Sequence, residues 1–345
     1  MVDAAAAVIT HPVQTLKEKI IEKIQEKVIP KSIKALVILG GIYAGFKTLK
    51  LSWNVLSFLS ETFIGGYDLK KRYGDKSWAL ITDATDALGS AFAIELGRVG
   101  FNIILVGNNF NKLLQVNNAL ARMRTKPLTK IIATDLSQAH TDEFFENAFA
   151  EVRELDVSII VNNAGKRISG DLSEHKDTEI RDTIVLNNIV PALLVRFFIN
   201  TMNQREHKSA IINVTNVGTF IPTFKSALYG GSQQFLNIFS QAIVPRFSDK
   251  IDILNYKACF TDPNSDNRVN IFSIPPQRTV LSCLDLLGRR TEIYGHWKHR
   301  ILGPMYCKYP RFRRFSDWLI LKTSQEIKFH PIKPKKSNIL KHNYQ

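Results

Sequence analysis

The chain has 345 residues, of which 45% are hydrophobic and 22% are charged, and this composition excludes a disordered or fibrous protein. Its formal net charge of +15 comes from the two ends, because residues 289–345 carry 14 Lys/Arg against 3 Asp/Glu and residues 1–80 carry 12 against 7. No zinc-finger, RNA-recognition or helix-turn-helix pattern accompanies this charge, so we expect no nucleic-acid partner. A basic flank beside aromatic residues is more typical of contact with anionic lipid or a partner protein.

The cysteines indicate neither a disulfide framework nor a metal site. Cys259, Cys283 and Cys307 are odd in number and form no CxxC pair. We therefore expect no metal and a reducing compartment.

Residues 1–76 are predicted to form a membrane-associated segment. Thr15–Val28 has the pattern of an amphipathic helix, with apolar residues at helical spacing: Leu16, Ile20, Ile21, Ile24 and Val28. Ala35–Phe46 is apolar or small throughout but spans only about 18 Å of a hydrocarbon core that is about 30 Å thick. Lys47 and Lys50 then interrupt before the apolar pattern resumes over Leu51–Ile64. The segment is either one spanning helix or a helix in the interface, with a buried soluble helix as a third alternative.

Residues 77–290 alternate short β-rich runs with longer helical runs. Six strands are predicted at Trp78–Thr82, Asn102–Val106, Lys130–Ala133, Val157–Val161, Ala210–Val214 and Ile251–Leu254. Helices are expected near 88–99, 111–123, 141–153, 180–203 and 229–246. This alternation predicts an α/β fold with a Rossmann-like, doubly wound parallel sheet, and ligands of such sheets bind beyond the carboxyl ends of the strands.

Residues 291–345 form a basic, aromatic C-terminal extension. The run His296–Arg300 is followed by basic residues interleaved with aromatic ones, namely Tyr306, Tyr309, Phe312, Phe315 and Trp318. This pattern is similar to the aromatic and cationic belt of an interfacial membrane segment. The alternative is a basic lid that packs on the domain.

Three short motifs point to one family. The segment Thr82–Gly89 (TDATDALG) follows the first predicted strand, Asn162-Asn163-Ala164-Gly165 follows the fourth, and Tyr229 opens a helix soon after the strand that ends Asn213–Asn216. In this order they resemble the glycine motif, the NNAG element and the catalytic tyrosine of short-chain dehydrogenase/reductases. The resemblance covers roughly residues 77–262 and is strongest to membrane-bound very-long-chain 3-oxoacyl-CoA reductases, relatives of 17β-hydroxysteroid dehydrogenases.

The resemblance implies a nicotinamide-binding site with altered residues. Its cofactor-binding positions are Gly89, Asp135, Asn162, Ala164 and Gly165, but two glycines of the phosphate loop are replaced by Asp83 and Ala87. A carboxylate at position 83 would repel a phosphate. The turn Gly107-Asn108-Asn109 also lacks the basic residue that receives the 2′-phosphate of NADP. We therefore expect no cofactor or weakly bound NADP(H), and Asp135 could equally serve local turn hydrogen bonds.

The implied catalytic set is also incomplete. Tyr229 matches the family's proton donor, whereas Gln233 stands at the position of the lysine that lowers the tyrosine pKa, and Asn216 stands at the position of the serine. The relay asparagine is Asn187 or Asn188. Both Tyr229 and the NNAG element could instead have structural roles, the first as a half-buried ring and the second as a turn that stabilises the sheet.

These departures lead to a prediction of function with two alternatives. The prediction is a non-catalytic accessory subunit of a membrane complex, for example a mitochondrial respiratory-chain assembly, with lipid and other subunits as partners. The first alternative is an active, membrane-bound NADPH-dependent 3-oxoacyl-CoA or hydroxysteroid reductase, and the second is a dinucleotide-binding sensor without turnover. The basic balance suggests the mitochondrial inner membrane, whereas the family resemblance implies the endoplasmic reticulum.

Overall fold

The computed structural model describes residues 17–23, 29–63, 65–139, 141–217, 226–259, 274–309 and 311. The chain divides into two units, residues 1–65 and residues 66–345. Within the predicted amphipathic helix, residues 17–23 are helical, and its remaining residues lie outside the described ranges. The predicted aromatic positions Phe312, Phe315 and Trp318 also lie outside them.

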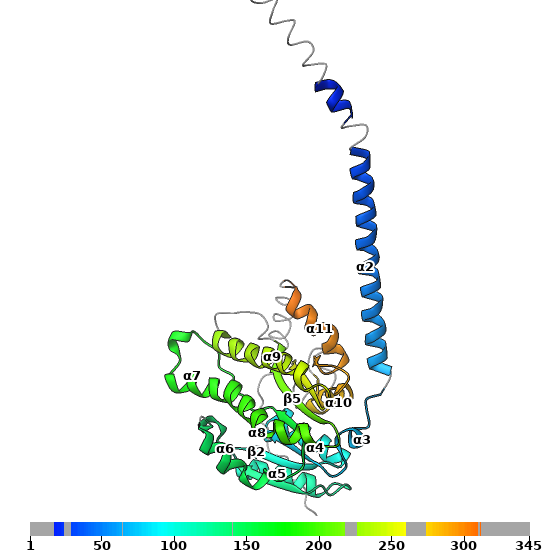
Figure 1. Cartoon of the computed structure of the whole chain (residues 1–345). Helices are drawn as coiled ribbons and strands as arrows, with labels where there is room; N and C mark the ends of the chain where they lie inside the picture. The colour runs from blue at the N-terminus through cyan, green and yellow to red at the C-terminus, as the bar shows by residue number, and fades with distance from the viewer. Residues whose placement is uncertain are drawn as a thin grey trace, which may run out of the picture. The chain divides into compact units, whose positions relative to one another are not determined.

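The N-terminal unit contains one continuous helix, α2 (Ile29–Phe63), of 35 residues, which runs through Lys47 and Lys50 without a break (Figure 1). Its length of about 52 Å exceeds the roughly 30 Å of a hydrocarbon core. The consecutive residues Leu36, Val37, Ile38 and Leu39 are all exposed, by 61 to 68%. Because each residue turns the helix by about 100°, these four present apolar surface on every side. The segment 31–61 is long and apolar enough to cross a membrane. Its residues 35–46 are apolar or small on every side, whereas Lys47, Lys50, Asn54 and Glu61 share one side of its second half.

The second unit is built on a seven-stranded sheet whose paired strands are all parallel, in the order β3-β2-β1-β4-β5-β6-β7. The strands are β1 (Trp78–Thr82), β2 (Asn102–Gly107), β3 (Thr129–Ala133), β4 (Val157–Asn162), β5 (Ser209–Asn216), β6 (Ile251–Ala258) and β7 (Glu292–Ile293). The six predicted strands are confirmed. The seventh, β7, has two residues and was not predicted.

Helices cover both faces of the sheet, as the doubly wound fold requires. One core lies between the sheet and α3 (Leu69–Tyr73), α4 (Ala87–Val99), α5 (Phe110–Ala121) and α10 (Pro276–Leu286). The other lies between the sheet and α6 (Asp142–Phe149), α8 (Val190–Gln204) and α9 (Ala227–Phe247). Every residue of β2 and of β4 is buried, which is the pattern of parallel strands covered on both sides.

Shorter elements connect these layers. Single turns of 3₁₀ helix are formed by Leu136–Gln138, Ala150–Val152 and Leu172–Glu174. The helix predicted over 180–203 is divided into α7 (Asp177–Ile184), a π-helical turn at Val185–Ile189 and α8. This second long apolar helix is half buried, as expected of a core helix of the domain.

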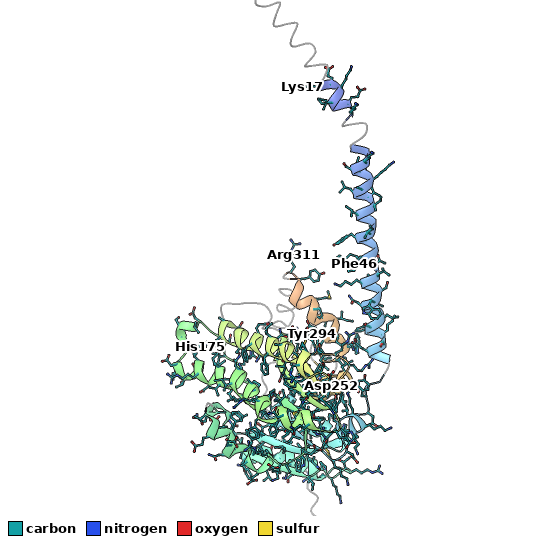
Figure 2. The ribbon with its side chains drawn as sticks, viewed as in Figure 1. Lys17, Phe46, His175, Asp252, Tyr294 and Arg311 are labelled. Atoms are coloured by element: carbon teal, nitrogen blue, oxygen red, sulfur yellow. The ribbon has the colours of Figure 1, made fainter. Side chains whose placement is uncertain are left out.

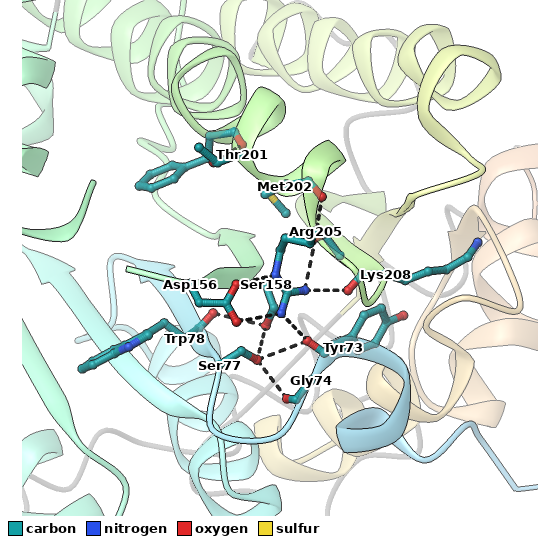
Figure 3. Close-up of polar contacts among 12 residues, drawn as sticks. Tyr73, Gly74, Ser77, Trp78, Asp156, Ser158, Thr201, Met202, Arg205 and Lys208 are labelled. Atoms are coloured by element: carbon teal, nitrogen blue, oxygen red, sulfur yellow. Dashed lines mark hydrogen bonds and ion pairs between the residues drawn. The ribbon is translucent and has the colours of Figure 1, made fainter. Parts of the chain in front are cut away.

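Polar side chains form hydrogen bonds and an ion pair at the edge of the sheet where the strands begin (Figure 3). The guanidinium group of Arg205 donates to the carboxylate of Asp156 at 2.5 and 2.9 Å and to the carbonyl oxygen of Tyr73 at 2.8 Å. The hydroxyl groups of Ser77 and Ser158 lie 2.7 Å apart. We call Tyr73, Ser77, Asp156, Ser158 and Arg205 the amino-edge cluster. It joins the end of α3 to the starts of β1 and β4.

The last described helix, α11 (Trp297–Lys308), follows β7. His299 is 2% exposed and Gly303 is also buried, and a Cβ atom at Gly303 would collide with the ring of Tyr294. One face of α11 therefore packs on the domain. For that face, this agrees with the alternative of a basic lid.

Candidate active site

A cleft of about 200 Å³ opens beyond the carboxyl ends of β1 to β4. Ten residues line it: Asp83, Gly107, Asn108, Thr134, Asp135, Leu136, Ala164, Gly165, Lys166 and Leu186. This is the edge of a parallel sheet at which nucleotides bind. Four of the residues named from the sequence, Asp83, Asp135, Ala164 and Gly165, therefore come together at one cleft.

The loop between β1 and α4 has a left-handed residue at one of its two altered glycine positions. Asp83 has φ = 48°, in the left-handed region that favours glycine. Its carbonyl oxygen accepts a hydrogen bond from the Asn163 side chain at 3.2 Å. A Cβ atom at Gly89 would collide with that same carbonyl oxygen and would lie 2.8 Å from the Asn163 amide nitrogen. Gly89 is thus required for the loop to close on α4, whose first residue is Ala87.

The charges of this loop oppose a phosphate. The side chain of Asp86 already caps α4, accepting a hydrogen bond from Leu88 N–H at 3.3 Å. Burial, followed by the neighbouring charge of Asp86, raises the pKa of Asp83, whereas a hydrogen bond from Thr85 and the charge of Lys112 act in the opposite direction. Two carboxylates therefore occupy the helix N-terminus at which a pyrophosphate would bind.

The other side of the cleft is lined by residues that follow β3 and β4. Asp135 lines the cleft while its carboxylate accepts a hydrogen bond from Ser137 N–H at 3.0 Å, so its local structural role is observed. Lys166, which the sequence analysis did not select, also lines the cleft and forms an ion pair with Asp182 at 2.8 Å. Its place directly after the NNAG element was the signal that could have identified it.

The NNAG element connects three strands. The Asn162 side chain donates to Asn213 Oδ1 at 2.7 Å, beneath the cleft rather than in its lining. The backbone N–H groups of Asn163 and Ala164 both donate to the hydroxyl of Thr82 at 2.9 Å. The element therefore fixes the end of β4 against β1 and β5 and has the structural role that the sequence analysis held open.

The two candidate relay asparagines both lie in the π-helical turn, and single π turns inside helices are frequent at functional sites. Asn187 accepts from Lys166 N–H at 2.8 Å and donates to the hydroxyl of Ser232 at 2.8 Å. Asn188 donates to the carbonyl oxygen of Ser232 at 3.2 Å. Asn187 therefore links the cleft loop to α9, whereas the Asn188 amide donates to α9.

Tyr229 lies in the first turn of α9, and burial raises the pKa of its phenol while the positive charge of Arg167 acts in the opposite direction. Arg167 was not selected from the sequence, although it follows Lys166 after the NNAG element. Gln233 is buried one turn further along α9, and its Oε1 accepts the backbone N–H of Asn216 at 2.9 Å. The residues at the family's lysine and serine positions therefore bind each other.

Thr215 does not replace the missing serine. Its hydroxyl donates to Asn255 Oδ1 at 2.9 Å on the neighbouring strand, in the buried interior. Because this hydroxyl is already bonded in the interior, and adjacent strand residues point to opposite faces, Thr215 does not stand in for residue 216.

Tyr229 and Gln233 thus lie one turn apart on α9, and Gln233 contacts the last residue of β5 in the parallel sheet. The family profile described as short chain dehydrogenase matches residues 77–270, and the chain belongs to this family.

The chain is 32% identical over 281 residues to a very-long-chain 3-oxoacyl-CoA reductase from Aspergillus oryzae, covering 78% of this chain and 80% of that protein. It is 30% identical over 303 residues to the hydroxysteroid dehydrogenase-like protein 1 of Gallus gallus, covering 83% and 87%. Among solved structures, a 7β-hydroxysteroid dehydrogenase superposes with a TM-score of 0.63 at 18% identity, covering 73% of this chain and 99% of that one. A short-chain dehydrogenase from Sphingobium yanoikuyae in complex with NADPH gives 0.55 at 20% identity, covering 74% and 97%. These two structures support the fold alone.

The comparisons correct the predicted function. Relatives at 30 to 32% identity are named as reductases, so the prediction of a non-catalytic accessory subunit of a mitochondrial complex is wrong, and the enzymatic alternative is favoured. That prediction rested on the replacement of two glycines, the serine and the lysine together.

Proposed function

We propose that this protein is a membrane-bound, nicotinamide-dependent carbonyl reductase that acts on a 3-oxoacyl-CoA or a hydroxysteroid-type ketone. The observation that carries the proposal is the match to very-long-chain 3-oxoacyl-CoA reductases, at 32% identity over 78% of the chain in the Aspergillus oryzae case. Tyr229, at the position of the family's proton donor, supplies the acid that the reaction needs.

The environment of Tyr229 suits reduction better than oxidation. Carbonyl reduction requires a neutral phenol that gives its proton to the developing alkoxide, whereas alcohol oxidation requires a phenolate. Burial raises the Tyr229 pKa, so the phenol is protonated at neutral pH. The positive charge of Arg167 limits this rise, while the family's lysine position is occupied by the uncharged Gln233. A bound nicotinamide cofactor would supply the hydride.

In this proposal the adenosine part of the cofactor is bound more favourably than its pyrophosphate. Asp135 and Leu136 would contact the adenosine part, and Lys166 supplies a positive charge in the cleft. Asp83 and Asp86 stand where the pyrophosphate binds, so we propose weaker dinucleotide binding than in a chain with glycine at position 83. The protein is therefore an active enzyme with a high dissociation constant for its cofactor in this proposal.

Membrane attachment is assigned to α2. Its length and its apolar composition support a spanning helix. The comparisons give no support to the mitochondrial inner membrane. The endoplasmic reticulum, which the resemblance implies, is the compartment to test, by fluorescence co-localisation of the full chain with organelle markers.

The activity is tested with the full chain reconstituted in lipid nanodiscs. NADPH oxidation and the reduced product are followed with a long-chain 3-oxoacyl-CoA and with a ketosteroid. We expect turnover of one substrate class and a loss of about 100-fold or more in Tyr229→Phe, the usual scale of general acid catalysis. Tyr67→Phe, at a tyrosine that is 48% exposed, is the matched control and should leave the rate unchanged. Equal rates for wild type and Tyr229→Phe on both substrates would refute the proposal.

A second candidate is dinucleotide binding without turnover. The hydrogen bond between Gln233 and Asn216 favours it, because both family positions are then occupied by uncharged groups that satisfy each other. The same preparation separates the two candidates. Saturable NADPH binding with no product from either substrate would support the second candidate over the first.

A further inference from the structure

Helix α11 has an apolar face that the domain leaves uncovered. Trp297, Ile301, Met305 and Tyr309 follow one another at intervals of four residues and are 45, 45, 36 and 52% exposed. Four residues turn a helix by about 400°, so Trp297, Ile301 and Met305 are offset by only about 40° from one to the next and form one stripe, which Tyr309 follows at the C-cap of the helix. The opposite face, with His299, is buried in the domain. We call these four residues the α11 stripe.

The chain segment that carries the stripe has formal charges of a single sign. Residues 293–311 contain no Asp or Glu, while Lys298, Arg300, Lys308 and Arg311 are basic. The Lys298 ammonium lies 5.9 Å from the centre of the Trp297 ring, and Arg311 lies beyond the end of α11 and is exposed (Figure 2). Positive charge therefore lies beside the apolar surface rather than across the domain from it.

This combination fits an anionic lipid surface. Trp and Tyr rings are enriched at the depth of lipid headgroups, and Lys and Arg near them are attracted by anionic lipids. A helix with one apolar face and flanking cations lies in the plane of the interface. Five residues, 64–68, connect α2 to α3, so a chain whose α2 crosses a bilayer keeps the domain tethered to that bilayer.

We propose that the α11 stripe docks into an anionic membrane surface and forms a second attachment of the domain to the bilayer. The inference rests on the proposed membrane anchoring by α2. It adds a contact that is sensitive to lipid charge, whereas a spanning helix is held by its apolar length alone.

The test uses the full chain in nanodiscs, with an environment-sensitive fluorophore on Ile301→Cys in a Cys307→Ser background. Cys259 and Cys283 are buried and are not expected to label. The matched control is the same label on Leu114→Cys, an exposed leucine of α5, at the opposite end of the domain from α11 (Figure 1). Quenching by spin-labelled lipid is measured in phosphatidylserine-containing and in pure phosphatidylcholine nanodiscs.

We expect quenching at position 301 to be several times stronger than at position 114 in the anionic nanodiscs. It should fall to the control value in 1 M salt, where the Debye length is about 3 Å, and in the charge-neutralised variant Lys298→Gln/Arg311→Gln. Equal quenching at the two positions would overturn the proposal. A label that is shielded but not quenched by lipid, in either lipid composition, would also overturn it and would indicate a second copy of the chain.

Failure of this inference is distinguishable from failure of the anchoring. A third label on Leu39→Cys reports on α2, which is exposed in the isolated chain. Quenching at position 39 without quenching at position 301 rejects the α11 contact alone. Absence of quenching at position 39 rejects the span.

Discussion

Replacing Asp83 with glycine is expected to tighten dinucleotide binding. Asp83 lines the cleft at the first altered glycine position, with φ = 48°. Two unit charges about 4 Å apart repel by about 4 kcal/mol at an effective dielectric of 20 and by about 1 kcal/mol in water. The carboxylate is only partly buried, so we take about 1 to 3 kcal/mol, or roughly 5-fold to 150-fold in the dissociation constant. Glycine also relieves the left-handed backbone at this position.

The assay is a fluorescence titration of NADPH against wild type, Asp83→Gly and Asp83→Asn. Asp83→Asn removes the charge but keeps a polar side chain, so it separates electrostatics from backbone strain. Because the pKa of Asp83 is raised in the fold, wild-type affinity should increase as the pH falls and the carboxylate becomes protonated. This pH dependence should be weaker in Asp83→Asn. If Asp83→Gly binds NADPH no more tightly than wild type, the argument about the phosphate loop is incorrect.

Three further outcomes are expected. The double variant Asn216→Ser/Gln233→Lys should raise turnover by restoring the cation beside Tyr229, yet it should reach the full rate only with Asp83→Gly and Ala87→Gly added, as steady-state kinetics with NADPH will show. Arg205→Met should lower the free energy of unfolding, measured by urea denaturation, by about 2 to 4 kcal/mol, because it removes charge-assisted hydrogen bonds of a side chain that is 9% exposed. The control Arg153→Met removes an ion pair that is about half exposed and should lower it by less than about 1 kcal/mol. Burial and the charges of His299, Lys298 and Arg278 lower the His296 pKa to about 4. The unfolded chain then binds more protons as the pH falls from about 6.5 to 4, so the hydrogen-exchange protection factors of α11, corrected for the intrinsic pH dependence of exchange, should decrease over that window, and less so in His296→Gln.

The fold class and most of the helices and strands could be predicted from the sequence. Alternating apolar runs are local signals, so six strands could be located before any tertiary contact was known. The motifs at Thr82–Gly89, Asn162–Gly165 and Tyr229 identified the family for the same reason, because each is read within a few consecutive residues. Strand β7 has two residues, which is too short for an alternating apolar pattern, so the sequence did not predict it.

The contacts of the site residues follow from the tertiary structure and not from local sequence. The assignment of Asn187 or Asn188 depended on one extra residue, and the π-helical turn accommodates that residue by turning both side chains toward α9. Gln233 and Asn216 are 17 positions apart, and no sequence pattern shows that a side chain at one binds the backbone of the other. Lys166 belongs to the cleft because the loop after β4 passes beside the ends of β2 and β3. Local sequence fixes the elements, whereas hydrogen bonds and charges between distant residues form only when the sheet brings its strand ends together.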